Sequence, residues 1–274
     1  NLFMAKMIPA LAPFEKAKIM CYKRHLLESL LRKGSLLLTI RSLLFYMLHW
    51  PTTLILSALI VIVRPFGIRA SYFFGRLWSR LNGIYLRLLC GISYEVIGGE
   101  NIPAGPAVYL AKHQSAWETV IFPSIFPPYM WVLKRELFYI PVFGWCLKVL
   151  GHIGIDREMG ITSLKQINSE GARLLKEGFS VIIFPEGTRI APGEMGEFNP
   201  GGVSLALKAG VPIVPVTHNA GLFWRRKEFA KRPGRITVVI DEPIPTEGLS
   251  PSSRKELNQK VRDIISGRLK EIGG

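Results

Sequence analysis

The sequence has few cysteines and no low-complexity linker. Its three cysteines, Cys21, Cys90 and Cys146, are odd in number and widely spaced. This pattern excludes a disulfide framework and a cysteine-based zinc site, so we expect a reducing compartment and no bound metal. Because no linker interrupts the chain, any boundary between two parts is approximate. The first residue is Asn1, and Met4 and Met7 are the candidate natural starts.

Acidic residues are also scarce. Asp and Glu number 20 against 35 Lys and Arg, which gives a formal net charge of +15. Such a surface favours a polyanionic partner, either nucleic acid or anionic lipid. The mean hydropathy of +0.25 and the 11% aromatic content are too apolar for an ordinary soluble nucleic-acid binder. We therefore expect an anionic phospholipid membrane as the partner, and no nucleic acid.

Charge is absent altogether from Ser42 to Val63, a run about as long as the roughly 20 residues that a helix needs to cross a bilayer. The run begins too late for a cleavable signal peptide. Pro51 lies near its middle, where proline would kink a helix. Basic residues flank both ends, so the positive-inside rule gives no single orientation. We expect a bent or re-entrant segment, with a single membrane-spanning helix as the alternative.

Arginines recur along the next stretch, from Phe66 to Leu89. At about 100° per residue, their spacing places four of them within roughly 20° of one line along a helix. These are Arg69, Arg76, Arg80 and Arg87. Large apolar residues occupy much of the remaining surface, a pattern typical of a helix in the headgroup zone of a membrane. We expect these arginines to contact the membrane; a core-packing helix with a solvated polar edge is the alternative.

After Gly91 the pattern changes to short β-rich runs between turns and helical stretches, which indicates an α/β sheet. The predicted strands are 93–97, 107–111, 130–133, 152–155, 180–184, 213–217 and 236–240. The predicted helices are 115–126, 162–177, 202–209 and 252–272. Continuous apolar runs such as VIIF favour strands covered on both faces. We expect membrane-associating helices over 1–90 and, over 91–274, an α/β domain with a mixed, mostly parallel sheet flanked by helices.

The segment KHQSAWE, residues 112–118, lies where a predicted strand gives way to a predicted helix. The amides at a helix start hold a developing anion. His113 would take a proton from an attacking alcohol if a carboxylate fixed its other nitrogen, and Glu118 is the nearest candidate. Ser115 and Glu118 also have the spacing of a capping box, in which both side chains only satisfy free amides. These two interpretations compete for the same carboxylate.

Two further segments follow predicted strands. FPEGTR, residues 184–189, places a carboxylate, a glycine and a guanidinium where α/β sheets bind ligands. Arg189 would match a phosphate bidentately, although a loop salt bridge is the alternative. The segment KRELFYIPVFG, residues 134–144, adds positive charge at the end of another strand.

Taken together, these segments resemble the glycerolipid acyltransferase family, and within it the bacterial 1-acyl-glycerol-3-phosphate acyltransferases. The four ordered blocks of that family read here as KHQSAWE, KRELFYIPVFG, FPEGTRI and VPIVPV, over roughly residues 107–217. Glu118 stands where the family usually has aspartate, Ile190 where serine is common, and Lys112 where asparagine often precedes the histidine. The late acyltransferases of lipid A synthesis share the His-to-Glu spacing but lack FPEGTR.

The resemblance implies an enzyme of phospholipid biosynthesis. It would transfer a fatty acyl group from acyl-ACP or acyl-CoA to the sn-2 hydroxyl of 1-acyl-glycerol-3-phosphate (lysophosphatidic acid), giving phosphatidic acid. His113 is implied as general base and Glu118 as its partner, with no acyl-enzyme. Lys134 and Arg189 would bind the phosphate, and Glu186, Gly187 and Thr188 would shape the pocket. No bound cofactor is expected, and the enzyme would lie on the cytoplasmic face of the inner membrane, monotopic or single-span.

Three points stay open at this level. A sibling acyltransferase with another lyso-lipid or glycerol-3-phosphate as acceptor would carry the same motifs. A non-enzymatic membrane or nucleic-acid adaptor would use the basic surface alone and leave the ordered motifs unexplained. The basic residues of 225–235 would add a second contact with anionic headgroups or with an acidic carrier protein, or would form a solvated loop.

Overall fold

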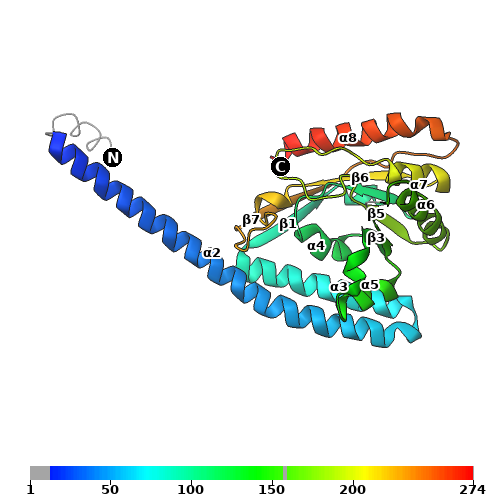
Figure 1. Ribbon diagram of the computed structural model, residues 1–274, viewed down its shortest axis with the longest axis horizontal. Coiled ribbons are helices and arrows are strands. Elements are labelled where there is room, and N and C mark those ends of the chain that lie inside the picture. Colours follow the sequence, from blue (N-terminus) through cyan, green and yellow to red (C-terminus); the bar gives the residue numbers. More distant parts are fainter. Residues whose placement is uncertain (1–12, 157–158, 274) are drawn as a thin grey trace.

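The first third of the chain forms a helical hairpin. The computed structural model describes residues 13–156 and 159–273, with side chains from residue 34 onward (Figure 1). Helix α2 (Pro13–Val63) runs into a short 3-10 turn (Arg64–Phe66), and the chain reverses at Gly67, whose φ is 110°. Helix α3 (Ile68–Tyr85) then returns along α2 and ends in a π-helical turn (Leu86–Cys90).

The chain does not reverse at Pro51, because the helix continues through this proline and the reversal comes at Gly67. Contacts with α3 hold α2 on both sides of Pro51. His49 Nδ1 lies 2.6 Å from Asn82 Oδ1, and Trp78 Nε1 donates to Thr53 Oγ1 at 2.8 Å. Among the described residues, Gly34–Phe66 is the helical segment long and apolar enough to cross a membrane.

A mixed sheet follows, and all seven predicted strands are present. In the described part of the chain the order is β1-β7-β6-β2-β5-β3-β4. Every neighbouring pair is parallel except β6 with β7. The strands are β1 (Ile92–Ile97), β2 (Val108–Ala111), β3 (Tyr129–Lys134), β4 (Ile153–Ile155), β5 (Ser180–Ile183), β6 (Ile213–His218) and β7 (Gly234–Ile240). The expectation of a mixed, mostly parallel sheet is confirmed.

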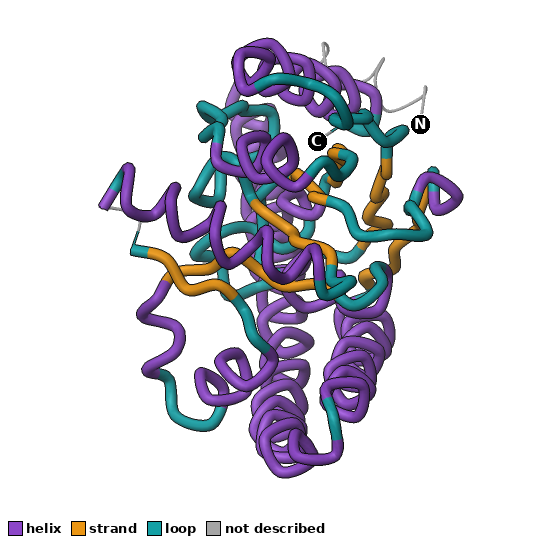
Figure 2. Tube along the Cα trace, turned by 90° about the vertical axis from the view of Figure 1, so that its right-hand side faces the viewer, coloured by secondary structure: helices purple, strands orange, loops and turns teal. Residues whose placement is uncertain are grey.

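Helices cover both faces of the sheet, as Figure 2 shows from the side. The predicted helices correspond to α4 (Trp117–Ile125), α6 (Ile161–Lys176), α7 (Gly201–Ala209) and α8 (Arg254–Glu271). Helix α5 (Phe143–Leu150) was not predicted. It is a single short apolar stretch, and such a stretch does not by itself distinguish a buried helix from a strand.

Alternate residues of the central strands supply two cores, because successive side chains of a strand point to opposite faces. Tyr109 and Ile182 pack with Trp117 of α4 and with Phe45 of α2 on one face. On the other face, residues such as Leu110 pack with α6, α7 and α8. Helix α2 therefore shares a core with the sheet.

Candidate active site

Four adjacent parallel strands, β6, β2, β5 and β3, end at one edge of the sheet. KHQSAWE follows β2 and FPEGTR follows β5. KRELFYIPVFG begins with the last residue of β3, and VPIVPV overlaps β6. In parallel sheets this edge is where ligands bind. The four blocks, which are far apart in the sequence, therefore lie along the same edge of the sheet.

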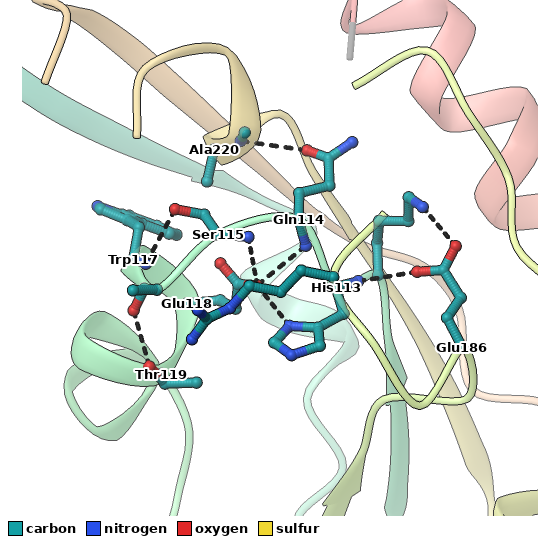
Figure 3. Close-up of polar contacts among 12 residues, drawn as sticks. His113, Gln114, Ser115, Trp117, Glu118, Thr119, Glu186 and Ala220 are labelled. Carbon is teal, nitrogen blue, oxygen red and sulfur yellow. Dashed lines mark hydrogen bonds and ion pairs between the residues drawn. The ribbon is translucent and has the colours of Figure 1, made fainter. Parts of the chain in front are cut away.

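His113, in the turn between β2 and α4, lies against Glu118 in the first turn of α4 (Figure 3). His113 Nδ1 is 2.7 Å from Glu118 Oε1. The same oxygen accepts the backbone amides of Gln114 at 3.0 Å and Ser115 at 2.8 Å. The capping and orienting interpretations do not compete, because one carboxylate oxygen performs both functions.

The imidazole of His113 is held on a second side by Phe184. The two rings stack with centroids 3.9 Å apart and an interplanar angle of 10°. The His113 side chain keeps 10% of its surface exposed. Within the described residues, no hydrogen bond is made by its other nitrogen, Nε2, which is also absent from the buried unpaired atoms. Nε2 is therefore the free, solvent-reaching nitrogen of a fixed ring.

His218, at the end of β6, is a buried neighbour of this pair that sequence reasoning missed. Its Nδ1 accepts the Ala220 amide at 3.3 Å, so Nε2 carries the proton and donates to the Lys112 carbonyl at 2.8 Å. Burial lowers the pKa of His218 below its ordinary value, while the nearby Glu118 opposes this shift. Its only signal in the sequence is its place two residues after the VPIVPV block.

Glu118 is charged although it is fully buried. Burial opposes the charge, but His218, His113 and the Ser115 amide together hold the pKa of this carboxyl below its ordinary value. Glu118 Oε2 lies 3.9 Å from His218 Nε2 and has no hydrogen-bond partner among the described residues. The negative charge therefore stays next to His113, where it would stabilise an imidazolium.

Glu186, which we expected to shape the pocket, is buried beside the His113 turn. Its side chain has no exposed surface and forms an ion pair with the equally buried Lys112. It also accepts the His113 amide at 3.2 Å (Figure 3) and the Gly196 amide at 3.0 Å. Every oxygen of the carboxylate is used inside the protein, so Glu186 acts on the site through the backbone of His113.

The rest of the FPEGTR segment forms a turn beside His113. Gly187 adopts φ 66°, a left-handed conformation that favours glycine. Ile190 donates its amide to the His113 carbonyl at 2.9 Å, which ties the two turns together. Thr188 is exposed and Arg189 is half-buried.

Arg189 lines an open cleft of about 370 Å³ together with Ala116 of the His113 turn. The other residues around this cleft are Tyr46, Trp224, Arg225, Arg226, Lys227, Glu228 and Phe229. Lys134 is not among them. It lies exposed at the end of β3 with its amine 3.3 Å from Glu136. The structure thus brings Arg189, but not Lys134, into the cleft beside the histidine turn.

The arginines of α3 are mostly at the surface. Arg69, Arg80 and Arg87 are exposed and Arg76 is half-buried. The basic stretch of 225–235 is less uniform than expected, because Lys231 is fully buried. Its amine lies over the rings of Tyr46 at 3.6 Å and Trp224 at 4.4 Å.

Comparison with known proteins identifies the family. A family model described as Acyltransferase matches residues 93–219. A 1-acyl-sn-glycerol-3-phosphate acyltransferase of Pseudomonas aeruginosa is 46% identical over 237 residues, covering 85% of this chain and 91% of that protein. The sheep 1-acyl-sn-glycerol-3-phosphate acyltransferase alpha is 33% identical over 196 residues, covering 70% and 68%.

The fold has a solved counterpart as well. The crystal structure of a 1-acyl-sn-glycerophosphate acyltransferase from Thermotoga maritima superposes with a TM-score of 0.72 at 22% identity, covering 89% of this chain and 98% of that one. This likeness shows that the folds agree. The identity to the Pseudomonas enzyme, over most of both chains, shows the family: the protein belongs to the 1-acyl-sn-glycerol-3-phosphate acyltransferases.

Proposed function

We propose that the protein transfers a fatty acyl group from a thioester donor to the sn-2 hydroxyl of 1-acyl-glycerol-3-phosphate, giving phosphatidic acid. The observation that carries the proposal is the fixed His113 ring. Its Nδ1 is bound by a buried, charged Glu118, and its Nε2 is free beside the Arg189 turn. The acceptor has a hydroxyl, which requires a base, and a phosphate, which requires a cation. His113 and Arg189 would supply these two groups.

In this reaction His113 Nε2 takes the proton of the acceptor hydroxyl as its oxygen forms a bond to the thioester carbonyl carbon. The carbon–sulfur bond then breaks, and the imidazolium returns the proton to the leaving thiolate. Glu118 stabilises the imidazolium between these two steps. General-base assistance of this kind contributes about 10² to 10⁴ in rate.

Direct transfer is favoured over an acyl-enzyme by the contacts of Ser115 and by the burial of two cysteines. The Ser115 hydroxyl donates to the Trp224 carbonyl at 2.6 Å and accepts the Trp117 amide at 3.1 Å. Cys90 and Cys146 are buried in helical parts of the chain. The acceptor's own hydroxyl is therefore the nucleophile.

We assign binding of the acceptor phosphate to Arg189; Lys134, the other cation expected from the sequence, does not line the cleft that Arg189 lines. In support of Arg189, the guanidinium lines the cleft next to Ala116 and forms no ion pair among the described residues. Gly187 and Thr188 shape the turn that presents it. Much of the catalytic effect would then come from holding the hydroxyl at His113 through the phosphate.

The helical hairpin would hold the enzyme on the cytoplasmic face of the inner membrane. Exposed large apolar side chains are concentrated on α2, among them Leu36, Leu43, Met47, Trp50, Leu54, Ile55 and Ile62. On the returning helix, Phe73 and Ile84 are exposed alongside the arginines. Since α3 returns along α2, we favour a monotopic hairpin that inserts into one leaflet, with its arginines at the anionic headgroups.

An assay with defined acceptors tests the proposed function. The purified protein in mixed micelles receives labelled acyl-CoA or acyl-ACP and a panel of acceptors: 1-acyl-glycerol-3-phosphate, glycerol-3-phosphate and lysophospholipids with larger headgroups. The expected main product is phosphatidic acid. Faster transfer to another acceptor would make the protein a sibling acyltransferase.

The base assignment has its own test. His113→Ala is expected to abolish transfer while the protein still binds 1-acyl-glycerol-3-phosphate. The variant's circular dichroism spectrum checks that it folds. A folded His113→Ala enzyme that retains transfer would refute the assignment.

A further inference from the structure

The loop between β6 and β7, residues 219–233, contacts both functional turns. The Trp224 carbonyl accepts the Ser115 hydroxyl at 2.6 Å, next to His113 in the β2–α4 turn. Arg226 Nη1 donates to the carbonyl of Arg189 at 3.0 Å. This single loop is therefore fixed to the turn that holds the base and to the turn that holds the phosphate-binding guanidinium.

Positive charge gathers where the loop meets these turns. Arg189, Arg225, Arg226 and Lys227 all line the cleft beside Ala116. Of these, only Arg225 has an acidic partner among the described residues, Glu228 at 3.5 Å. Arg189 Nε is buried and makes no hydrogen bond in the described structure. Four cations around one cleft with a single carboxylate, Glu228, among the lining residues leave an excess of positive charge that attracts an anion.

The loop is held in shape at its tip and at its far end. Lys227, at the tip, has φ 65°, a conformation that costs free energy for a non-glycine residue and persists only where the surroundings impose it. Further along, the Lys231 amide donates to Ser42 Oγ of α2 at 2.8 Å. The Lys231 amine also lies 4.7 Å from the centroid of the Phe45 ring. These contacts position Arg226 before any ligand arrives, which reduces the entropy lost on binding.

We propose that Arg226 is the second cation of the phosphate site, where it grips the phosphate monoester of the acceptor together with Arg189. The inference rests on the proposed function and refines it, because Lys134 does not line the cleft. A phosphate monoester carries about −1.5 to −2 charges near neutral pH. Two guanidinium groups joined through a backbone hydrogen bond match that charge and present paired donors to its oxygens.

Substrate-dependent kinetics of Arg226→Gln test this assignment. The KM for 1-acyl-glycerol-3-phosphate is expected to rise about ten-fold or more, the usual effect of losing a hydrogen bond to a charged group. We expect kcat to stay within about two-fold and the donor KM to stay unchanged. The preference for this acceptor over 1-acyl-glycerol, which lacks the phosphate, is expected to fall by the same factor as the KM rises. Loss of structure in the His113 turn would instead slow both acceptors equally.

Arg235→Gln is the matched control. Arg235 belongs to the same basic stretch, but it is exposed on β7 and pairs with Glu95 at 2.8 Å. This variant should keep wild-type values of KM for both substrates. An unchanged acceptor KM in Arg226→Gln would overturn the proposal. A rise in the donor KM alone, with acyl-CoA or with acyl-ACP, would also overturn it and assign the cleft to the phosphates of the donor.

A binding measurement separates this inference from the proposed function. Without any donor, 1-acyl-glycerol-3-phosphate in mixed micelles should bind the wild-type protein about ten-fold more tightly than it binds Arg226→Gln. If the wild-type protein acylates none of the acceptors but this difference is found, the proposed function fails and the phosphate site stands. If transfer occurs and the difference is absent, the phosphate site fails alone.

Discussion

Glu118 and His113 are joined through a single carboxylate oxygen that also closes the turn leading from His113 into α4. Glu118 Oε1 contacts His113 Nδ1 at 2.7 Å while it accepts the amides of Gln114 and Ser115. The ring and the backbone that carries it are thus fixed by the same atom. Since the oxygen is buried, water does not compete for these hydrogen bonds.

The variant Glu118→Gln removes the negative charge of this side chain and keeps its size. The amide oxygen of glutamine still accepts the two backbone amides, so we expect the protein to fold. Without the negative charge the imidazolium is less stable, and kcat is expected to fall about 10² to 10⁴-fold. Steady-state kinetics with both substrates saturating provide the measurement. A variant with wild-type kcat would show that Glu118 serves only as a cap.

Acid should weaken the fold through the same residue. The folded-state pKa of Glu118 is lowered, so its charge contributes stability in full above the unfolded-state value of about 4.3. That contribution is lost as the pH falls through the folded-state pKa. The difference in unfolding free energy between wild type and Glu118→Gln is therefore expected to shrink as the pH falls below about 4.3. Urea unfolding in detergent over this range measures it, and a constant difference would contradict the assignment of charge.

Lys112 and Glu186 form a buried ion pair beneath the site. Lys112→Met would leave the Glu186 carboxylate buried without its cation, and we expect a loss of about 3 to 5 kcal/mol in unfolding free energy. Adding Glu186→Gln should restore part of this loss. Lys134→Met is the control, because Lys134 and Glu136 are about half exposed and such pairs contribute about 0 to 1 kcal/mol. Equal losses of unfolding free energy in Lys112→Met and Lys134→Met would show that burial does not make breaking the ion pair more costly.

The arginines of α3 should bind the membrane electrostatically. Changing Arg69, Arg76 and Arg80 to Gln is expected to weaken binding to vesicles with anionic lipid by roughly 1 kcal/mol each, and the loss should shrink in high salt. Co-sedimentation measures the partition. Lys255, Lys260 and Lys270, exposed on α8 across the sheet from the hairpin, provide a triple control with the same change of charge. Equal losses in the two triple variants would contradict a specific membrane face.

Several charged residues have surroundings that no local pattern indicates. The FPEGTR segment predicts a carboxylate at a strand end, yet Glu186 is enclosed by Lys112 and the His113 backbone. The basic stretch predicts surface charge at Lys231, which is instead enclosed by rings from α2 and from its own loop. Burial of a charge depends on partners far away in the chain, so it is decided only when those segments come together.

The sequence by itself determined the seven strands, most helices and the segments that carry the chemistry, because strand alternation, turns and motif spacing are local properties. It left open where the chain turns back in the first third, since contacts with α3 keep α2 helical through Pro51. Tertiary structure alone decided that the turns after β2 and β5 lie side by side and that the loop after β6 covers them. Strand order arises from packing between distant segments, and that packing is what places Arg189 and Arg226 beside the His113 turn.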